Sequence, residues 1–135
     1  MSEPIKPVPV PNEDSRRFWD GCNEGRLVLQ KCRLCSHVRF YPRICCTECG
    51  ATDTDWIVAS GRGTVYSHAT VHRAPSAAFK ADVPYVLALV TLDEGPRMMT
   101  NIVGCRPDTV TIDMPVKVVF DRVSKDIAVP KFEPA

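Results

Sequence analysis

Four cysteines arranged in two pairs are the residues of this chain best suited to chemistry. Cys32 and Cys35 form one C-x2-C pair, and after a ten-residue insert Cys46 and Cys49 form a second. Each pair can fold into a tight turn that directs both sulfur atoms toward one point, so two turns offer four thiolates to one tetrahedral ion. Gly50 follows the second pair and lets the chain reverse there without a clash at Cβ. The spacing therefore predicts a structural metal site, which zinc fits best.

Two alternatives apply to this metal site. Four cysteines form two disulfides in many exported proteins, but no charged and apolar leader opens this chain and no long apolar run follows, so we expect reduced thiols and a cytoplasmic protein. Iron is the second candidate ion, because rubredoxins also bind their metal with four cysteinates.

The identity of the third ligand is also open, because Cys45 directly precedes Cys46 and offers a C-x3-C frame. We choose Cys46, since its loop has the same length as that of the first pair. Cys22, Cys45 and Cys105 then remain, and an odd remainder argues against a full set of disulfides. We expect these three to be small buried residues or inert thiols.

The composition is that of one ordinary domain or two very small ones. The chain has 135 residues, of which 44% are hydrophobic and 24% charged, and 17 basic against 16 acidic side chains give a net charge of +1. This near-neutral balance provides no long-range attraction toward nucleic acid or an anionic membrane. The hydrophobic content is enough for a modest core.

The first segment, residues 1–25, is predicted to be an arm followed by a short helix. Prolines in residues 2–11 favour an extended arm, either free or lying on a partner. Asn12 or Asp14 is predicted to cap a helix that runs through Asn23. Phe18 and Trp19 fall on one side of this helix, where they pack in the core or contact a partner.

The second segment, residues 26–58, is predicted to be a zinc ribbon. Alternating residues favour strands at 26–31, near 40–41 and at 56–58, and the two cysteine turns join them.

The third segment, residues 59–135, contains strand-like runs at 64–72, 84–93, 98–103 and 115–123. With residues 56–60 these make five strands, which suggest a small closed barrel. Residues 92–97 read as a hairpin turn, residues 73–83 as a binding loop, and the tail from Lys125 as an extended segment.

The sequence contains no recognisable catalytic motif. The chain has no nucleophile elbow, P-loop or dinucleotide fingerprint. His68 and His72 lie four apart on one predicted strand, but no nucleophile or orienting group accompanies them. We therefore predict no catalytic residue in this chain. A ribbon followed by a small barrel also suggests single-stranded nucleic-acid binding, which is our alternative function, although the basic residues are spread along the sequence.

Several motifs together resemble a known family of short bacterial and archaeal proteins. These proteins join a rubredoxin-like zinc ribbon to an acyl-CoA-associated OB-fold, and the resemblance extends from Phe18 to Phe120. The carriers are Phe18-Trp19, Leu27-x3-Lys31-Cys32-x2-Cys35, Tyr41-Pro42-Arg43, Cys46-x2-Cys49-Gly50, Ser60-Gly61-Arg62-Gly63-Thr64-Val65-Tyr66-Ser67, Pro84-Tyr85-Val86, Leu92-Asp93-Glu94-Gly95 and Pro115-Val116-x3-Phe120. The resemblance implies a mostly β fold with a short N-terminal helix, a rubredoxin-like zinc ribbon and a five-stranded OB-fold barrel.

The resemblance also implies a partner. Such proteins are similar to small accessory subunits of thiolase or retro-aldolase complexes, in which a thiolase-like chain carries the catalytic residues and acyl-CoA is the substrate. The expected function is thus that of a zinc-binding, non-catalytic subunit that stabilises its partner and helps to hold the acyl-CoA. Arg43, Arg73 and Lys80 are our candidate contacts for the CoA phosphates.

Overall fold

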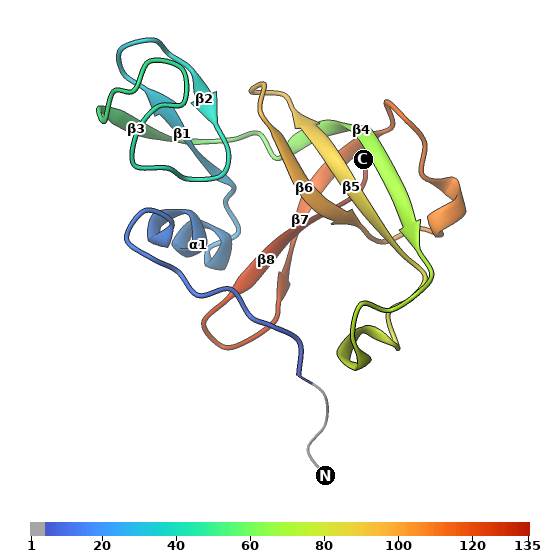
Figure 1. Cartoon of the computed structure of the whole chain (residues 1–135). Helices are drawn as coiled ribbons and strands as arrows, with labels where there is room; N and C mark the ends of the chain where they lie inside the picture. The colour runs from blue at the N-terminus through green and yellow to red at the C-terminus, as the bar shows by residue number, and fades with distance from the viewer. Residues whose placement is uncertain (1–4) are drawn as a thin grey trace.

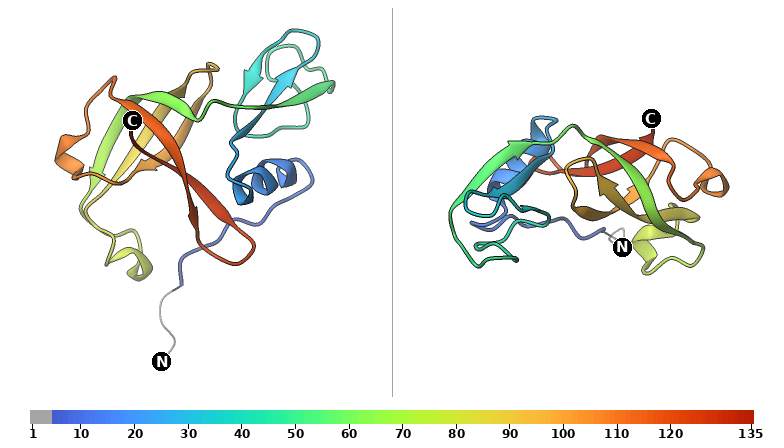
Figure 2. Two further views of the ribbon diagram at one scale, coloured as in Figure 1. Left: turned by 180° about the vertical axis from the view of Figure 1, so that it is seen from behind. Right: turned by 90° about the horizontal axis from the view of Figure 1, so that it is seen from above.

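The chain folds into a small cysteine-bearing sheet with a helix beside it, followed by a closed barrel. The computed structural model describes residues 5–135, and Figure 1 shows the sheet and helix on one side of the molecule and the barrel on the other. Two views from other directions show the same arrangement (Figure 2). The elements are α1 (Arg16–Asn23), β1 (Val28–Cys32), β2 (Val38–Arg39), β3 (Thr54–Val58), β4 (Arg62–Val71), the 3-10 turn η1 (Ala77–Phe79), β5 (Tyr85–Leu92), β6 (Arg97–Ile102), the 3-10 turn η2 (Pro107–Thr109), β7 (Pro115–Arg122) and β8 (Ala128–Pro134).

The helix α1 begins at Arg16, one residue after Ser15. The side chain of Asn12 accepts a hydrogen bond from the backbone N–H of Ser15 (2.9 Å), and the Ser15 hydroxyl accepts one from the N–H of Asn12 (3.1 Å). Asn12 therefore closes the turn that leads into the helix, while no side chain caps the helix itself. The arm before it, from residue 5, forms neither helix nor strand, and residues 2–4 of the predicted arm lie outside the described residues. No helix within residues 5–135 has the length and apolar character to cross a membrane.

Aromatic side chains join α1 to the cysteine-bearing segment. Phe18 and Trp19 are 1% and 7% exposed. The centre of the Phe18 ring lies 5.5 Å from that of Phe40 and 5.7 Å from that of Tyr41, and the centre of the Trp19 ring lies 6.5 Å from that of Tyr41. The indole N–H of Trp19 donates a hydrogen bond to the Tyr41 hydroxyl at 3.0 Å, which satisfies its only polar atom. Phe18 and Trp19 are thus core residues of this chain, one of the two roles that the sequence left open.

The first sheet has the order β2-β1-β3, and both pairings are antiparallel. Gln30 lies opposite Arg39 on one side and Trp56 on the other, and Cys32 lies opposite Thr54. The return strand β2 has only two residues, Val38–Arg39, so Phe40 and Tyr41 lie just beyond its end. This short sheet supports the two cysteine turns.

The second sheet is a closed five-stranded barrel with the order β4-β5-β6-β8-β7. Antiparallel ladders join β4 to β5, β5 to β6, β7 to β8, and β7 back to β4. The remaining seam, between β6 and β8, is parallel and consists of the pair Ile102 and Phe132, with the N–H of Val103 donating to the Phe132 carbonyl at 2.7 Å. The expected mostly β class with a five-stranded closed barrel is confirmed.

The assignment of the fifth barrel strand from sequence is wrong. We expected residues 56–60 to supply it, but β3 pairs with β1 alone and belongs to the first sheet. The fifth strand is β8, in the tail that we expected to be merely extended. Its side chains alternate inward and outward, with Ala128, Pro130 and Phe132 buried, so the tail carries the pattern of a half-buried strand.

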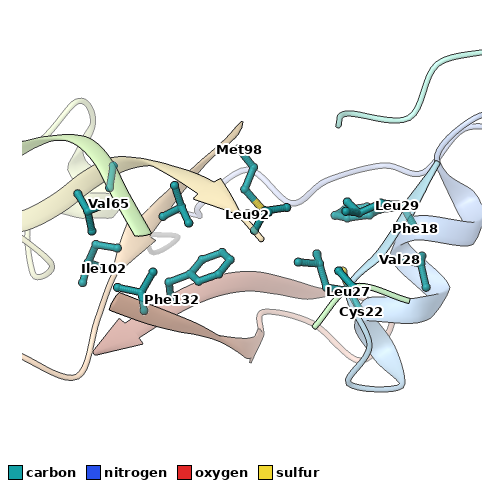
Figure 3. Close-up of a cluster of buried hydrophobic side chains, with 14 of the residues drawn as sticks. Phe18, Cys22, Leu27, Val28, Leu29, Val65, Leu92, Met98, Ile102 and Phe132 are labelled. Atoms are coloured by element: carbon teal, nitrogen blue, oxygen red, sulfur yellow. The ribbon is translucent and has the colours of Figure 1, made fainter. Parts of the chain in front are cut away.

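A continuous apolar core runs through both parts. Figure 3 shows the barrel members Val65, Ile102 and Phe132 at one end and members of α1 and β1, including Phe18 and Leu29, at the other. Leu92 and Met98 lie between these groups in the view, on either side of the turn of the β5–β6 hairpin. The first sheet, the helix and the barrel therefore share buried contacts.

The segment between β3 and β4, residues 59–61, links the two sheets and is held in place by the β5–β6 hairpin. The Glu94 carboxylate accepts a hydrogen bond from the Ser60 N–H at 2.9 Å, and the N–H of Asp93 donates to the Arg62 carbonyl at 3.0 Å. At Gly63 a Cβ would lie 2.5 Å from the carbonyl oxygen of Thr91, so only glycine fits this approach. The Gly-rich link and the hairpin motif, which are separate in the sequence, therefore form one structural unit.

Candidate metal centre

The four paired cysteines converge on one point. The sulfur atoms of Cys32, Cys35, Cys46 and Cys49 all lie within 4.8 Å of one another. The Sγ atoms of Cys32 and Cys49 are 3.6 Å apart, and those of Cys35 and Cys46 are 3.5 Å apart. A tetrahedral zinc ion with Zn–S bonds of about 2.3 Å separates its sulfurs by about 3.8 Å, so this arrangement fits zinc closely.

The two cysteine turns repeat one hydrogen-bonding pattern. In the first, the N–H of Ser36 donates to the Cys32 carbonyl at 3.0 Å, and in the second the N–H of Gly50 donates to the Cys46 carbonyl at 2.9 Å. Ser36 and Gly50 occupy the same place in the two turns, and both have positive φ, of 64° and 77°. The left-handed conformation explains why glycine follows the second pair, because side chains other than glycine are strained there.

Backbone amides prepare the first thiol of each pair for a metal. Hydrogen bonds from the backbone N–H of Cys35, and more weakly from Leu34, lower the pKa of the Cys32 thiol to about 6. The N–H groups of Cys49 and Glu48 lower the pKa of Cys46 in the same way. The pKa of the second thiol of each pair is raised, because burial and the neighbouring sulfurs outweigh its own backbone hydrogen bond. A bound ion displaces these remaining protons, since cysteine ligates as the thiolate.

The three other cysteines lie outside this group. Cys45 is exposed, Cys105 is half-buried, and Cys22 is 1% exposed in the core. Burial raises the pKa of Cys22 to about 12, which makes it an unreactive thiol. All seven cysteines are free of disulfides. Of the two frames that the sequence offered, the structure places Cys46, and not Cys45, among the converging sulfurs.

The predicted CoA contacts do not gather in one place. Arg43 lies on the loop that precedes the second cysteine pair, and it lines a cavity of about 640 Å³ between this loop and the β5–β6 hairpin. His37 and Arg97 line the same cavity. Arg73 and Lys80 lie on the exposed loop between β4 and β5, at the far end of the barrel (Figures 1 and 2). A site made by all three residues is therefore not formed within this chain.

The structure also locates the predicted binding loop, residues 73–83, and the two histidines, His68 and His72. Residues 73–83 contain the turn η1, and Lys6 of the N-terminal arm lies against this loop, with its ammonium 2.5 Å from the Asp82 carboxylate and 5.5 Å from the centre of the Phe79 ring. His68 lies in β4, opposite Ala88 of β5, whereas His72 follows the end of that strand. One residue of interest gave no sequence signal at all: Arg39 is 3% exposed inside the ribbon.

Two family models match the chain and together cover most of it. The model described as "ChsH2, rubredoxin-like zinc ribbon domain" matches residues 19–55, and "ChsH2, C-terminal OB-fold domain" matches residues 56–121. The first match contains all four converging cysteines.

Relatives of known description agree with these models. A "DUF35 domain-containing scaffold protein" of Methanocaldococcus jannaschii is 40% identical over 112 residues, which cover 82% of this chain and 79% of that protein. A "Probable enoyl-CoA hydratase alpha subunit" of Thermomonospora curvata is 40% identical over 131 residues, which cover 97% of this chain. The chain spans only 40% of the length of that second relative.

Solved structures share the fold. A chain in the structure of an "Ltp2-ChsH2(DUF35) aldolase" superimposes with a TM-score of 0.84 at 39% identity, covering 94% of this chain and 98% of that chain. A DUF35 protein of Sulfolobus solfataricus, at 14% identity and a TM-score of 0.64, shares the fold alone. With its zinc ribbon and OB-fold both matched in order along the sequence, this chain belongs to the DUF35 family, as a protein of the ChsH2 type.

Proposed function

We propose that this chain is a non-catalytic, zinc-bearing accessory subunit of a heteromeric, thiolase-like enzyme that acts on acyl-CoA thioesters. The observation that carries the proposal is the full-length match to a chain of an aldolase complex, at 39% identity with 98% of that chain covered. The catalytic partner in our proposal is a thiolase or a retro-aldolase, which supplies the nucleophile and the acid–base groups. The complex works in the cytoplasm, where the thiols stay reduced.

The ion in this proposal is structural zinc held by Cys32, Cys35, Cys46 and Cys49. Four thiolates complete the tetrahedral shell of zinc and leave no position for water or substrate. Such a site stabilises the fold of the ribbon and does not activate a nucleophile. The role of the ribbon is therefore to present a rigid surface to the partner.

Contact with CoA is a narrower part of the proposal. Arg43 is the best placed of the three candidate residues, because its cavity also contains His37 and Arg97, and basic side chains suit phosphate groups. Arg73 and Lys80 would meet the substrate only at a second place, on the loop between β4 and β5. Each residue is tested separately, by the KM of the complex for acyl-CoA after substitution by glutamine.

Co-purification tests the proposed assembly. The chain is expressed with an affinity tag together with a thiolase-like protein from the same genome, and cleavage of an acyl-CoA is assayed for each chain alone and for the mixture. We expect one stable complex and turnover in the mixture only. Turnover by the isolated chain would refute an accessory role, and a complex that hydrates enoyl-CoA without cleaving a carbon–carbon bond would assign it to a hydratase instead.

A further inference from the structure

A buried arginine in the ribbon has no counter-charge among the described residues. Arg39 of β2 is 3% exposed and is the only charged residue buried to this degree within residues 5–135. Its Nη2 atom donates to the Arg43 carbonyl at 3.2 Å and to the Thr54 hydroxyl at 2.8 Å, both of which are neutral oxygens. Its Nε and Nη1 atoms have no hydrogen-bond partner, and no carboxylate of the described residues forms an ion pair with it. A buried and unpaired charge is costly, so its presence needs an explanation.

The strand register places Arg39 beside the cysteines. Arg39 lies opposite Gln30, and Gln30 is two residues before Cys32, so both side chains leave the same face of the sheet as the Cys32 thiol. Thr54, which accepts the Arg39 hydrogen bond, lies directly opposite Cys32, and directly opposed residues have Cβ atoms about 5 Å apart. The Arg39 guanidinium is therefore hydrogen-bonded to the residue that faces the first ligand, Cys32, across the sheet.

The second contact of Arg39 reaches the other cysteine turn. The Arg43 carbonyl that accepts its hydrogen bond is three residues before Cys46. The Gln30 side chain fixes the same loop, because its Oε1 atom accepts the Arg43 N–H at 2.7 Å. Arg39 thus pairs with the strand that leads into the first cysteine turn and donates a hydrogen bond to the loop that leads into the second.

The charge of the metal centre is opposite to that of Arg39. Four thiolates around a divalent zinc ion leave a net charge of about −2, which no bound water or further ligand offsets. In a partly buried ribbon this charge interacts with nearby ions more strongly than it would in bulk water. A cation held within the protein, and not free to exchange with solvent, therefore stabilises the thiolates.

We propose that Arg39 is the built-in counter-ion of the zinc–thiolate centre. The inference rests on the proposed zinc and goes beyond it, because it assigns a role to a residue outside the ligand set. The ion and the arginine support each other: the zinc centre compensates the buried guanidinium, and the guanidinium compensates the excess thiolate charge. In this scheme Arg39 acts through its charge on the thiolates and does not touch the ion.

The test compares zinc affinity in three variants of the full chain, by competition with a chromophoric chelator. Arg39→Met removes the charge and keeps an unbranched side chain, and we expect a loss of affinity of about 10- to 100-fold, the range for residues that support metal ligands. Arg39→Lys keeps the charge without the planar fork and is expected to stay within about threefold of the wild type. Arg33→Gln is the matched control, because Arg33 lies between Cys32 and Cys35 but is exposed and pairs with Asp55. Its loss is expected to be below about threefold, since water and salt screen exposed charges.

Each outcome decides the question. Equal affinity of Arg39→Met and the wild type overturns the counter-ion role. An equal loss in Arg39→Lys and Arg39→Met also overturns it, because hydrogen-bond geometry would then matter and charge would not. If circular dichroism shows that Arg39→Met does not fold with zinc present, Arg39→Lys decides alone, and a tenfold loss there counts against the proposal. A wild-type protein that binds no zinc instead refutes the proposed metal, which is a separate failure.

Discussion

Truncation of Phe132 is the sharpest test of the barrel as the structure has it. Phe132 lies in β8, is fully buried, and forms the seam to β6 through Ile102 and the N–H of Val103. Phe132→Ala removes a whole aromatic ring from the core and leaves a cavity between strands that are held by their ladders. If β8 were only an extended tail, the same substitution would change little.

The expected loss follows from burial. Truncating a fully buried phenylalanine costs about 3–5 kcal/mol, from the lost transfer energy and the cavity together. The free energy of unfolding of a domain is about 5–15 kcal/mol, so this loss is a large share of the total. Lys131→Ala is the control on the same strand, because its ammonium pairs with Asp121 near the surface at 2.6 Å. Such a pair contributes only about 0–1 kcal/mol.

Urea unfolding, followed by far-UV circular dichroism, measures both variants. With a urea dependence of about 2 kcal/mol per molar, a typical value for small proteins, the midpoint for Phe132→Ala is expected to fall by about 1.5–2.5 M. The midpoint for Lys131→Ala is expected to fall by less than about 0.5 M. Equal midpoints for the two variants would refute the place of β8 in the barrel.

Four further outcomes follow from the structure. Cys46→Ser is expected to abolish zinc binding, measured by elemental analysis, whereas Cys45→Ser keeps one zinc per chain; the reverse result would shift the ligand frame by one residue. Gly50→Ala is expected to cost about 1 kcal/mol in urea unfolding, because its φ is +77° while no atom lies close enough to clash. At pH 8 iodoacetamide is expected to alkylate Cys45 in the native protein and not Cys22, whose pKa is raised to about 12; mass spectrometry of the native protein would contradict this by finding Cys22 modified first. Asn23→Ala is expected to cost about 1–3 kcal/mol, since the Asn23 amide donates to the Asp126 carbonyl of the β7–β8 turn at 2.7 Å and accepts from the N–H of Ala128, the first residue of β8, at 2.9 Å. A thermal midpoint equal to that of the wild type would contradict this contact.

The sequence carried most of the information about the ribbon, because its signals are local. The spacing of Cys32 and Cys35, repeated at Cys46 and Cys49, requires two similar turns, and the structure has two with one hydrogen-bond pattern. The equal loop lengths also favoured Cys46 over Cys45, and the sulfur atoms converge in that frame.

The fifth barrel strand, β8, was harder to predict because it contains prolines. Pro130 and Pro134 lie in β8, and proline within a run usually argues against a strand. The structure accommodates them because β8 pairs with β6 through one residue pair only, which leaves most of that side without ladder partners. The competing assignment, residues 56–60, failed because β3 completes the sheet of the ribbon.

Residues whose roles depend on neighbours distant in the sequence were the hardest to identify from the sequence. Arg43, Arg73 and Lys80 were chosen for their charge, and charge alone does not report which residues the fold brings together. Arg39 has the opposite problem, since an arginine in a short strand reads as a surface residue, and only the register shows that its side chain shares a face with Cys32.

The central claim is that four cysteine sulfurs saturate the ion, which makes this chain a structural component of a larger enzyme. X-ray absorption spectroscopy at the zinc edge of the purified full chain measures this shell directly. The account predicts four sulfur neighbours at about 2.3 Å and no oxygen or nitrogen neighbour. A shell of three sulfurs with one oxygen at about 2.0 Å would contradict it, because a position open to water is the mark of a catalytic zinc.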